Sequence, residues 1–248
     1  MILTVVIGNT NTRFVWFRGH RLVRSLVLAT SAVRRGRFPK PGRIAGVAVS
    51  SVVPDVARRV CTRLRDAAGL EPFVVGPRTQ TGLSFSYRRR DLGADRVCAA
   101  VGAWHRFPGQ DVIVFDFGTA TTFNVVLREG IFAGGAILPG IQMSLNALGA
   151  GTAGLPTLLP GRLRSPVRHS TRAAIKSGVA NLFAGGIDRI IDRTESLIGR
   201  PFLVVATGGA ADAARRYSKR LRILRPRLAN EGLAELLYLG RGERTATA

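Results

Sequence analysis

Long apolar runs are absent from this 248-residue chain. Although 46% of its residues are hydrophobic, Arg, Asp or Gly interrupts each apolar segment before it reaches the roughly 18 residues that a membrane-spanning helix needs. The apolar start from Ile2 to Ile7 is too short for the core of a signal peptide and leads directly into a Gly-Asn-Thr turn. We therefore expect a globular cytoplasmic protein with no membrane partner.

Cysteine is also scarce. The two cysteines, Cys61 and Cys98, fit no metal-binding spacing, and their small number is typical of a reduced, cytoplasmic protein. We interpret both as buried small apolar residues. The three histidines, His20, His105 and His169, are isolated in the sequence, so they do not predict a metal site.

Lysine and acidic residues are few, which leaves a strongly basic chain. Arginine supplies almost all of the formal charge of +22, because the only lysines are Lys40, Lys176 and Lys219. An arginine-rich surface attracts phosphates, but codon bias toward arginine at solvated positions gives the same composition. No aromatic residues interleave with the arginines to stack on bases. Nucleic acid is therefore an alternative partner that the composition does not favour.

The order of the apolar segments predicts an α/β protein with an internal duplication. A buried strand, a Gly-Thr turn and a second strand open the chain, and the same pattern restarts near residue 112. We predict two domains, residues 1–112 and 113–248. The predicted strands are 2–7, 14–17, 43–53, 73–75, 112–115, 123–127 and 203–205, and the predicted helices are 55–68, with Asp55 as N-cap, 93–107, 141–148, 170–197 and 210–221.

The two strand–turn–strand segments indicate a site for a polyphosphate. Glycine lets the backbone approach a phosphate closely, and the backbone N–H groups and hydroxyls of such turns donate to phosphate oxygens. One Gly-Thr turn is weak evidence, because it can be purely structural. Two turns at matching places, with Thr207-Gly208-Gly209 after a later strand, are stronger evidence and are typical of the actin-like and sugar-kinase ATPases.

The detailed motifs narrow this resemblance to one family, the type III pantothenate kinases. They stand in the family's order over most of the chain up to about residue 210, and their members are Gly8-Asn9-Thr10-Asn11-Thr12, Ser50-Ser51-Val52-Val53-Pro54, Leu92-Gly93-Ala94-Asp95-Arg96, Asp116-Phe117-Gly118-Thr119-Ala120-Thr121-Thr122, Gly134-Gly135-Ala136-Ile137, Pro139-Gly140, Thr171 with Ser177-Gly178, and Thr207-Gly208-Gly209. The resemblance implies a two-domain, duplicated ribonuclease H-like fold of the actin type. It also implies ATP-dependent phosphorylation of pantothenate, the first step of coenzyme A synthesis.

The resemblance further implies a set of site residues. Asp95 would be the catalytic base for the pantothenate hydroxyl, and Asp116 would lie near Mg²⁺ and a monovalent cation, K⁺ or NH₄⁺. The substrate-binding residues would be Tyr87, Gly93, Ala94, Asp95, Arg96 and Thr171. The nucleotide-binding residues would be Val6, Ile7, Gly8, Asn9, Thr10, Asn11, Thr12, Arg13, Thr119, Gly208 and Gly209. Family members are generally homodimers.

Three positions depart from the family pattern. Val6 stands where the family has an aspartate that positions Mg²⁺ against the ATP phosphates, and the first acidic residue of the chain is Asp55. Asn124 replaces another aspartate. The residues Arg88-Arg89-Arg90-Asp91 replace an Asn-Pro loop that helps to form the pantothenate pocket, with one residue fewer.

Three hypotheses therefore stand: a working pantothenate kinase of normal or low rate, a non-catalytic paralogue that binds nucleotide or pantothenate, and an arginine-rich regulator that contacts nucleic acid.

One further glycine motif does not indicate a dinucleotide site. Gly149, Gly151 and Gly154 spell G-x-G-x-x-G, but they follow a predicted helix, whereas a dinucleotide-binding fingerprint follows a strand and opens a helix.

Overall fold

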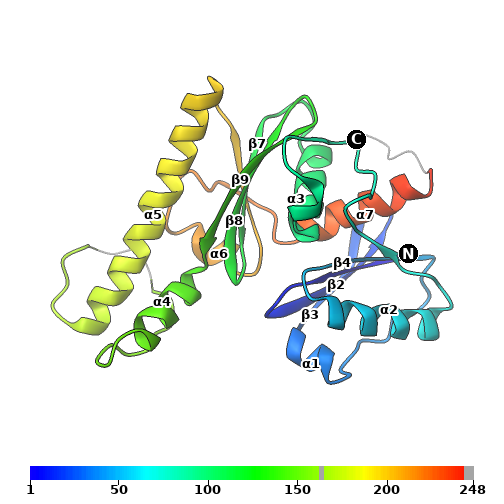
Figure 1. Ribbon diagram of the computed structural model, residues 1–248, viewed down its shortest axis with the longest axis horizontal. Helices are drawn as coiled ribbons and strands as arrows, with labels where there is room; N and C mark the ends of the chain where they lie inside the picture. The colour runs from blue at the N-terminus through cyan, green and yellow to red at the C-terminus, as the bar shows by residue number, and fades with distance from the viewer. Residues whose placement is uncertain (162–164, 243–248) are drawn as a thin grey trace. The chain divides into compact units, whose positions relative to one another are not determined.

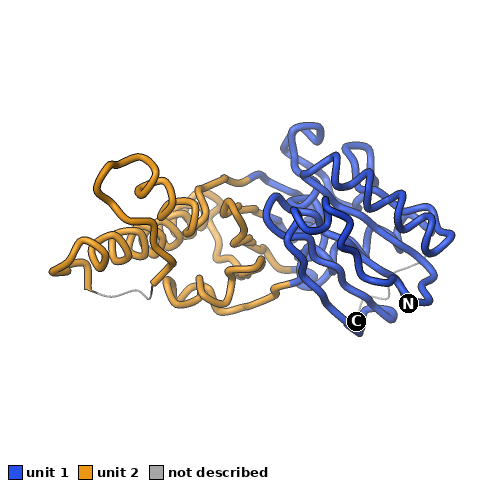
Figure 2. Tube along the Cα trace, turned by 90° about the horizontal axis from the view of Figure 1, so that it is seen from below, with its two compact units in different colours: residues 1–109, 126–134, 227–248 blue, residues 110–125, 135–226 orange. Residues whose placement is uncertain are grey.

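A computed structural model describes residues 1–161 and 165–242. It divides into two compact units, which are described separately here. Unit 1 contains residues 1–109, 126–134 and the C-terminal segment from 227, and unit 2 contains residues 110–125 and 135–226 (Figures 1 and 2). The C-terminal helix thus belongs to unit 1, so the boundaries of the compact units differ from those of the predicted domains, 1–112 and 113–248. Those ranges stay a prediction about the duplication.

Unit 1 is built on a five-stranded sheet of order β3-β2-β1-β4-β5. β1 (Ile2–Ile7) pairs with β2 (Asn11–Arg18) as an antiparallel hairpin and with β4 (Gly46–Ser51) in parallel. β3 (Arg21–Ala29) forms one edge and β5 (Phe73–Val74) the other. A short helix, α1 (Thr30–Arg34), follows β3. The central strands are continuous apolar runs because both of their faces are buried.

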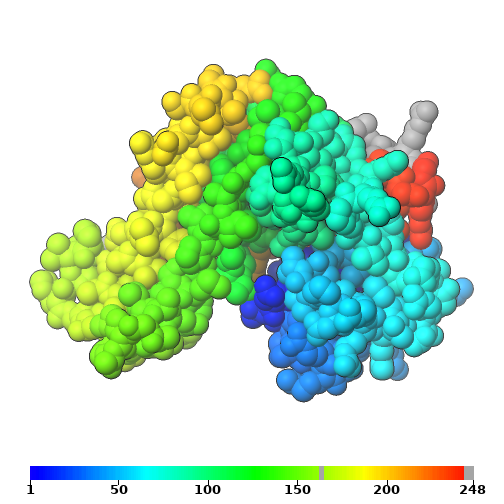
Figure 3. Space-filling model, in the orientation of Figure 1, coloured from blue at the N-terminus to red at the C-terminus, as the bar shows by residue number. Residues whose placement is uncertain are grey.

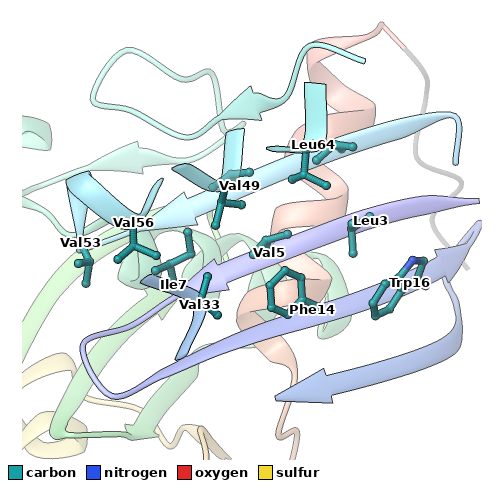
Figure 4. Close-up of a cluster of buried hydrophobic side chains, with 12 residues drawn as sticks. Leu3, Val5, Ile7, Phe14, Trp16, Val33, Val49, Val53, Val56 and Leu64 are labelled. Atoms are coloured by element: carbon teal, nitrogen blue, oxygen red, sulfur yellow. The ribbon is translucent and has the colours of Figure 1, made fainter. Parts of the chain in front are cut away.

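The core of unit 1 lies between this sheet and α2 (Pro54–Ala68). Leu3, Val5 and Ile7 of β1 pack with Phe14 of β2 and Leu64 of α2, and Figure 4 shows these side chains directed into one cluster. Burying side chains of this size contributes about 1.5–3 kcal/mol each before the entropy cost of folding. The cluster fixes β1 in the middle of the unit, and with it the turn that follows Ile7.

Two helices, α3 (Ala94–Arg106) and α7 (Leu228–Gly240), pack against each other in unit 1 at an unusually close crossing. A Cβ on Gly232 would overlap the carbonyl oxygen of Cys98, and one on Gly102 would overlap that of Leu228. Asn230 of α7 donates a 3.1 Å hydrogen bond to the Thr4 hydroxyl of β1. The crossing therefore depends on two glycines far apart in the sequence.

A second sheet has the order β11-β10-β7-β8-β9-β6, in which β10 pairs in parallel with β7 and with β11. Its strands are β6 (Ser84–Phe85), β7 (Val112–Phe117), β8 (Ala120–Leu127), β9 (Ile131–Pro139), β10 (Leu203–Thr207) and β11 (Ile223–Leu224). The helices of unit 2 are α4 (Ile141–Ala150), α5 (Thr171–Ile198) and α6 (Ala211–Ala214). A 3₁₀ turn, η1 (Arg89–Asp91), precedes α3 in unit 1.

Most predicted elements are confirmed, and two predictions are wrong. Asp55 is not the N-cap of α2: Val53 takes that place, Pro54 opens the helix and Asp55 pairs with Arg34 at 2.9 Å. The helix predicted at 210–221 ends at Ala214, because the following residues turn away to bury Tyr217 and Ser218. The strands β3 and β9 and the helix α7 were not predicted. No helix among the described residues is long and apolar enough to cross a membrane.

Candidate functional site

The turn between β1 and β2 is the first predicted phosphate turn, and it is held by its own backbone and by Thr30. The Gly8 N–H donates to the Asn11 carbonyl at 2.9 Å. The Thr30 hydroxyl donates to the Gly8 carbonyl at 2.7 Å and lies 3.0 Å from the Thr12 hydroxyl. Thr12 and Thr30 are buried, while Asn9, Thr10 and Asn11 are exposed. The exposed part of the turn is thus supported from beneath by a pair of threonines.

Val6 lies near the end of β1, directly before this turn. Its cross-strand partner on β2 is Arg13, and partners of this kind place their side chains on the same face of a sheet. Both side chains are half-buried. The position where the family has a metal-binding aspartate therefore carries a methyl-bearing side chain with an arginine beside it.

The turn between β7 and β8 is the second predicted phosphate turn. The Gly118 N–H donates to the Ala120 carbonyl at 3.1 Å, which closes a tight turn that exposes Thr119. Two other segments of unit 2 pack onto it. A Cβ on Gly208 (φ +93°) would collide with Asp116 Oδ1, and one on Gly140 would collide with the Thr119 carbonyl. These contacts require glycine, and they bring Asp116, Thr119 and Gly208 together.

Asn124 points into the core of unit 2. It is fully buried on β8, and its amide Nδ2 donates a 3.4 Å hydrogen bond to the Thr122 hydroxyl. A carboxylate at this depth would carry a large desolvation cost, whereas a hydrogen-bonded amide does not. The neutral residue therefore suits its surroundings.

Asp95 occupies the first turn of α3, where the positive end of the helix dipole favours an acidic side chain. Its Oδ1 accepts a 2.8 Å hydrogen bond from the Arg96 backbone N–H. Burial nevertheless raises the pKa of the Asp95 carboxyl above its ordinary value, and this effect exceeds the lowering by the Arg96 N–H and charge. A carboxylate with a raised pKa is a better proton acceptor than an ordinary aspartate.

The Arg96 side chain, the next on α3, is buried between aromatic rings. Its guanidinium lies 5.5 Å from the centroid of the Tyr87 ring and 5.6 Å from that of Phe132, and the two rings meet edge to face. Cation–π contacts stabilise a desolvated guanidinium without adding a negative charge beside it. Tyr87 and Phe132 thus hold a buried cation, Arg96, beside Asp95 in the sequence.

The Arg88–Arg90 segment also borders this region of unit 1. Arg89 lies over the Phe85 ring at 4.2 Å and donates to the carbonyls of Gly76 and Thr79 at 3.3 and 3.2 Å. It lines a cavity of about 260 Å³ with Gly93 and Ala94, at the start of α3. The loop is therefore tied down by one of its arginines, which lies beside the predicted substrate residues Gly93 and Ala94.

Each of the two turns fits phosphate oxygens better than it fits a metal ion. Both present glycine and threonine, whose N–H and O–H groups donate to phosphate oxygens. Mg²⁺ needs oxygen ligands and usually takes one or two carboxylates. Unit 1 offers valine and arginine at that place, and unit 2 offers Asp116. No group of three or more His, Cys, Asp or Glu side chains that could hold a metal occurs among residues 1–161 and 165–242.

The structure brings the predicted residues together within each unit. In unit 1 it groups Gly93, Ala94, Asp95, Arg96 and Tyr87 around the start of α3, and the residues from Val6 to Arg13 form the β1–β2 hairpin. In unit 2 it groups Asp116, Thr119 and Gly208, with Gly209 adjacent. Thr171 opens α5 of unit 2, so its part in a pocket with the unit 1 residues stays a prediction.

Three contributing residues escaped the sequence analysis: Thr30, Phe132 and Arg89. Thr30 opens the helix α1 directly after β3, and Phe132 lies on β9; none of these three elements was predicted. The segment 131–139 reads Ile-Phe-Ala-Gly-Gly-Ala-Ile-Leu-Pro, in which apolar and polar residues do not alternate, so the sequence gives no clear strand signal for β9. The sequence shows Arg89 only as part of a charged loop. It gives no sign that this side chain donates to the carbonyls of Gly76 and Thr79, which lie 13 and 10 positions upstream.

Comparisons with known proteins agree with this arrangement. Residues 2–193 match the family model described as "Type III pantothenate kinase". The chain is 36% identical over 250 residues to a type III pantothenate kinase of Anaeromyxobacter sp. (strain K), covering 94% of this chain and 97% of that protein. It is 34% identical over 247 residues to that of Myxococcus xanthus, with 94% and 96% coverage.

Solved structures resemble it in fold. A Campylobacter jejuni protein named for the Baf family of transcriptional activators superposes with a TM-score of 0.65 at 19% identity, covering 97% of this chain and 99% of that one. The activator of the 2-hydroxyisocaproyl-CoA dehydratase from Clostridium difficile, with bound ADPNP, gives a TM-score of 0.51 at 14% identity, with 100% and 99% coverage. The predicted actin-like α/β ATPase fold is thereby confirmed.

Proposed function

Because the chain belongs to the type III pantothenate kinase family, we propose that it transfers the γ-phosphoryl group of ATP to the primary hydroxyl of pantothenate, at a rate limited by Val6. The observation that carries this proposal is the environment of Asp95 and Arg96. A half-buried carboxylate with a raised pKa directly beside a buried cation suits a base paired with a carboxylate-binding group.

In this reaction Asp95 accepts the proton of the pantothenate hydroxyl. The hydroxyl oxygen forms a bond to the γ-phosphorus while the bond from that phosphorus to the β,γ-bridging oxygen breaks, and ADP leaves. Arg96 binds the pantothenate carboxylate, and its ring cage of Tyr87 and Phe132 keeps the guanidinium in place. Arg89 closes the pocket by anchoring the shortened loop.

The nucleotide phosphates are assigned to the two hairpin turns, Gly8 to Thr12 and Gly118-Thr119, with Gly208 and Gly209 near the adenosine end. When bound, Mg²⁺ neutralises phosphate charge, and Asp116 is the residue proposed to hold it. Arg13, next to Val6, adds a positive charge at the first turn. It can offset part of the phosphate charge, although it does not position a metal.

The test is ATP-dependent phosphorylation of pantothenate by the purified protein with Mg²⁺ and K⁺, beside the Asp95→Asn variant. We expect slow turnover by the natural protein and a loss on the order of 10²–10⁴-fold in the variant. Folding of the variant is checked by circular dichroism. Turnover that survives Asp95→Asn unchanged would contradict the role of Asp95, and absence of turnover by the natural protein would contradict the kinase function.

A non-catalytic protein that binds nucleotide or pantothenate is the second candidate. The valine–arginine pair at the first turn and the neutral Asn124 favour it, because both remove charge that the family places at its metal and phosphate site. Calorimetric binding of ATP or pantothenate without turnover would support it. The homodimer, the monovalent cation and the cytoplasmic location are proposed from the family resemblance alone.

A further inference from the structure

Unit 2 contains a cavity that none of the predicted site residues lines. It has a volume of about 480 Å³, within the range of roughly 300–1,000 Å³ typical of small-molecule sites. Its walls come from the segment before α5, the first turns of α5, and α6 with the residues that follow it. In Figure 1 these elements are labelled α5 and α6, and the space-filling view shows α5, in yellow-green to yellow, at the surface of the unit (Figure 3).

Three cations line this cavity: Arg168, Lys176 and Arg216. No carboxylate belongs to its described lining. None of the three side chains forms a hydrogen bond or an ion pair with any residue in the described parts of the chain. Three like charges around one hollow repel one another, so the arrangement is costly until an anion enters.

The overall excess of arginine does not account for this cluster. Elsewhere in unit 2 arginines pair with acids where acids are near. Arg200 lies 2.8 Å from Asp111, and Arg220 contacts both Asp192, at 2.9 Å, and Glu195, at 2.6 Å. Moreover, the cavity contains one of the three lysines of the chain, and its side chain is half-buried.

The cavity walls are also fixed. The Tyr217 hydroxyl donates a 2.6 Å hydrogen bond to the Gly161 carbonyl, and the ring is buried. The stem of Lys176 packs on Gly161, where an added Cβ would lie 3.2 Å from the Lys176 Cδ. Ala173 and Lys176 lie in the first two turns of the 28-residue helix α5, whose N-terminal end carries a partial positive charge. A cavity held in this way is prepared for its ligand before the ligand binds.

We propose that this cavity is a binding site for a small multiply charged anion of phosphate type, held by Arg168, Lys176 and Arg216. Arginine binds phosphate through paired N–H donors and lysine binds it as a point charge. The site is distinct from the phosphate turns, because Asp116, Thr119 and Gly208 do not line it. The inference does not depend on the kinase reaction.

Calorimetric titration of the full chain with tripolyphosphate at constant ionic strength tests the proposal. We expect saturable binding that Ala173→Glu weakens by at least 10-fold, because the new carboxylate would enter the cavity. Ala174→Glu is the matched control: it makes the same charge change on the same helix, but residue 174 is exposed and does not line the cavity. Equal losses in the two variants, or no saturable binding by the natural protein, would overturn the proposal.

A second pair of variants covers the case in which Ala173→Glu fails to fold. Lys176→Gln removes a cation from the cavity, and Arg172→Gln removes one from the exposed, non-lining side of α5. Only the first should weaken binding, and an effect of both equally would again contradict the site. Titration in saturating ATP then distinguishes the sources of the anion. Competition indicates the phosphates of a nucleotide, and independent binding indicates a free oligophosphate.

Discussion

The hairpin β1–β2 of unit 1 and the hairpin β7–β8 of unit 2 have the same backbone plan. Each first strand has six residues with the same burial pattern, and its fifth residue is the half-buried one. Each first strand also has a parallel neighbour, in which Ser50 lies beside Val6 and Thr207 lies beside Asp116. Val6 and Asp116 are therefore equivalent positions of a duplicated structure, and unit 2 has the carboxylate that unit 1 lacks.

The two turns are also held by different chemistry. Glycines support the turn of unit 2, since Gly140 and Gly208 allow other backbone segments to pack directly on it. A side chain supports the turn of unit 1, since the Thr30 hydroxyl donates to the Gly8 carbonyl. The comparison teaches that a duplicated backbone can persist while its charge and its supports change independently.

Val6→Asp should have the largest effect, because it makes the two hairpins alike in charge. If the family reaction operates, the new carboxylate should raise turnover on the order of 10²–10³-fold and lower the Mg²⁺ concentration needed for half-maximal rate. Val6→Asn is the control, since asparagine has nearly the same shape as aspartate but carries no charge. A carboxylate that only pairs with Arg13 would leave the Mg²⁺ dependence unchanged, and that outcome would contradict the equivalence in function.

Gly208→Ala should break the turn of unit 2. Its φ of +93° is unfavourable for alanine, and the added Cβ would collide with Asp116 and Phe117. We expect a loss of roughly 2–4 kcal/mol of unfolding free energy, measured by urea denaturation. Gly209→Ala serves as the control, because nothing lies within 4 Å of a Cβ there. Equal stability of the two variants would show that the close contact is not needed.

Thr30→Val should loosen the turn of unit 1 and leave that of unit 2 unchanged. The substitution removes the hydroxyl that bonds to the Gly8 carbonyl and to the buried Thr12 hydroxyl. Losing these hydrogen bonds should lower the free energy of unfolding by about 1–3 kcal/mol. Amide hydrogen exchange should rise in residues 8–12 and stay unchanged in residues 116–122. Ser31→Ala, at an exposed position of the same helix, should change neither. Faster exchange in both turns would contradict separate supports.

Asp95→Asn should have the smallest effect on stability, and its sign depends on pH. Burial raises the folded-state pKa of Asp95 above the ordinary 3.8, so this carboxyl lowers the stability of the folded protein as the pH rises above 3.8, and the loss is complete once the pH exceeds the raised pKa. The asparagine variant should therefore melt at a higher temperature than the natural protein at pH 7. The difference should vanish below pH 3.8, where both forms are neutral. A lower melting temperature for the variant at pH 7 would show that the charged form is stabilised.

Much of the fold could be predicted from sequence, because the central strands β1, β4 and β7 are apolar runs and α2, α3 and α5 have long helical patterns. The edge strand β3 was missed: its apolar residues are interrupted by Arg24 and Ser25, and most of them are exposed rather than part of a core. The predicted helix at 210–221 was too long because tertiary contacts outweighed local preference: the Tyr217 and Ser218 side chains bond to Gly161 and Asp188.

The site was predictable where motifs are local and unpredictable where partners are distant. Asp95 and Arg96 stand side by side in the sequence, and the structure keeps them together at the start of α3. The support of Gly8 by Thr30 joins residues 22 positions apart, and the ring of Phe132 reaches Arg96 from a strand 36 positions later. No local pattern encodes such pairs, because they depend on how the strands are ordered in the sheet.

The glycine crossing of α3 and α7 has a consequence for the order in which the protein forms during synthesis. The helix α3, which carries Asp95 in its first turn, is covered by residues 228–240, which a ribosome makes only after all of residues 135–226 of unit 2. At about 5–20 residues per second, the residues from the end of α3 to the end of α7 take roughly 7–27 s to make, and the α3 surface waits that long for its partner. The nascent chain therefore carries an apolar helix face that chaperones can bind, and unit 1, although it starts first, is completed last.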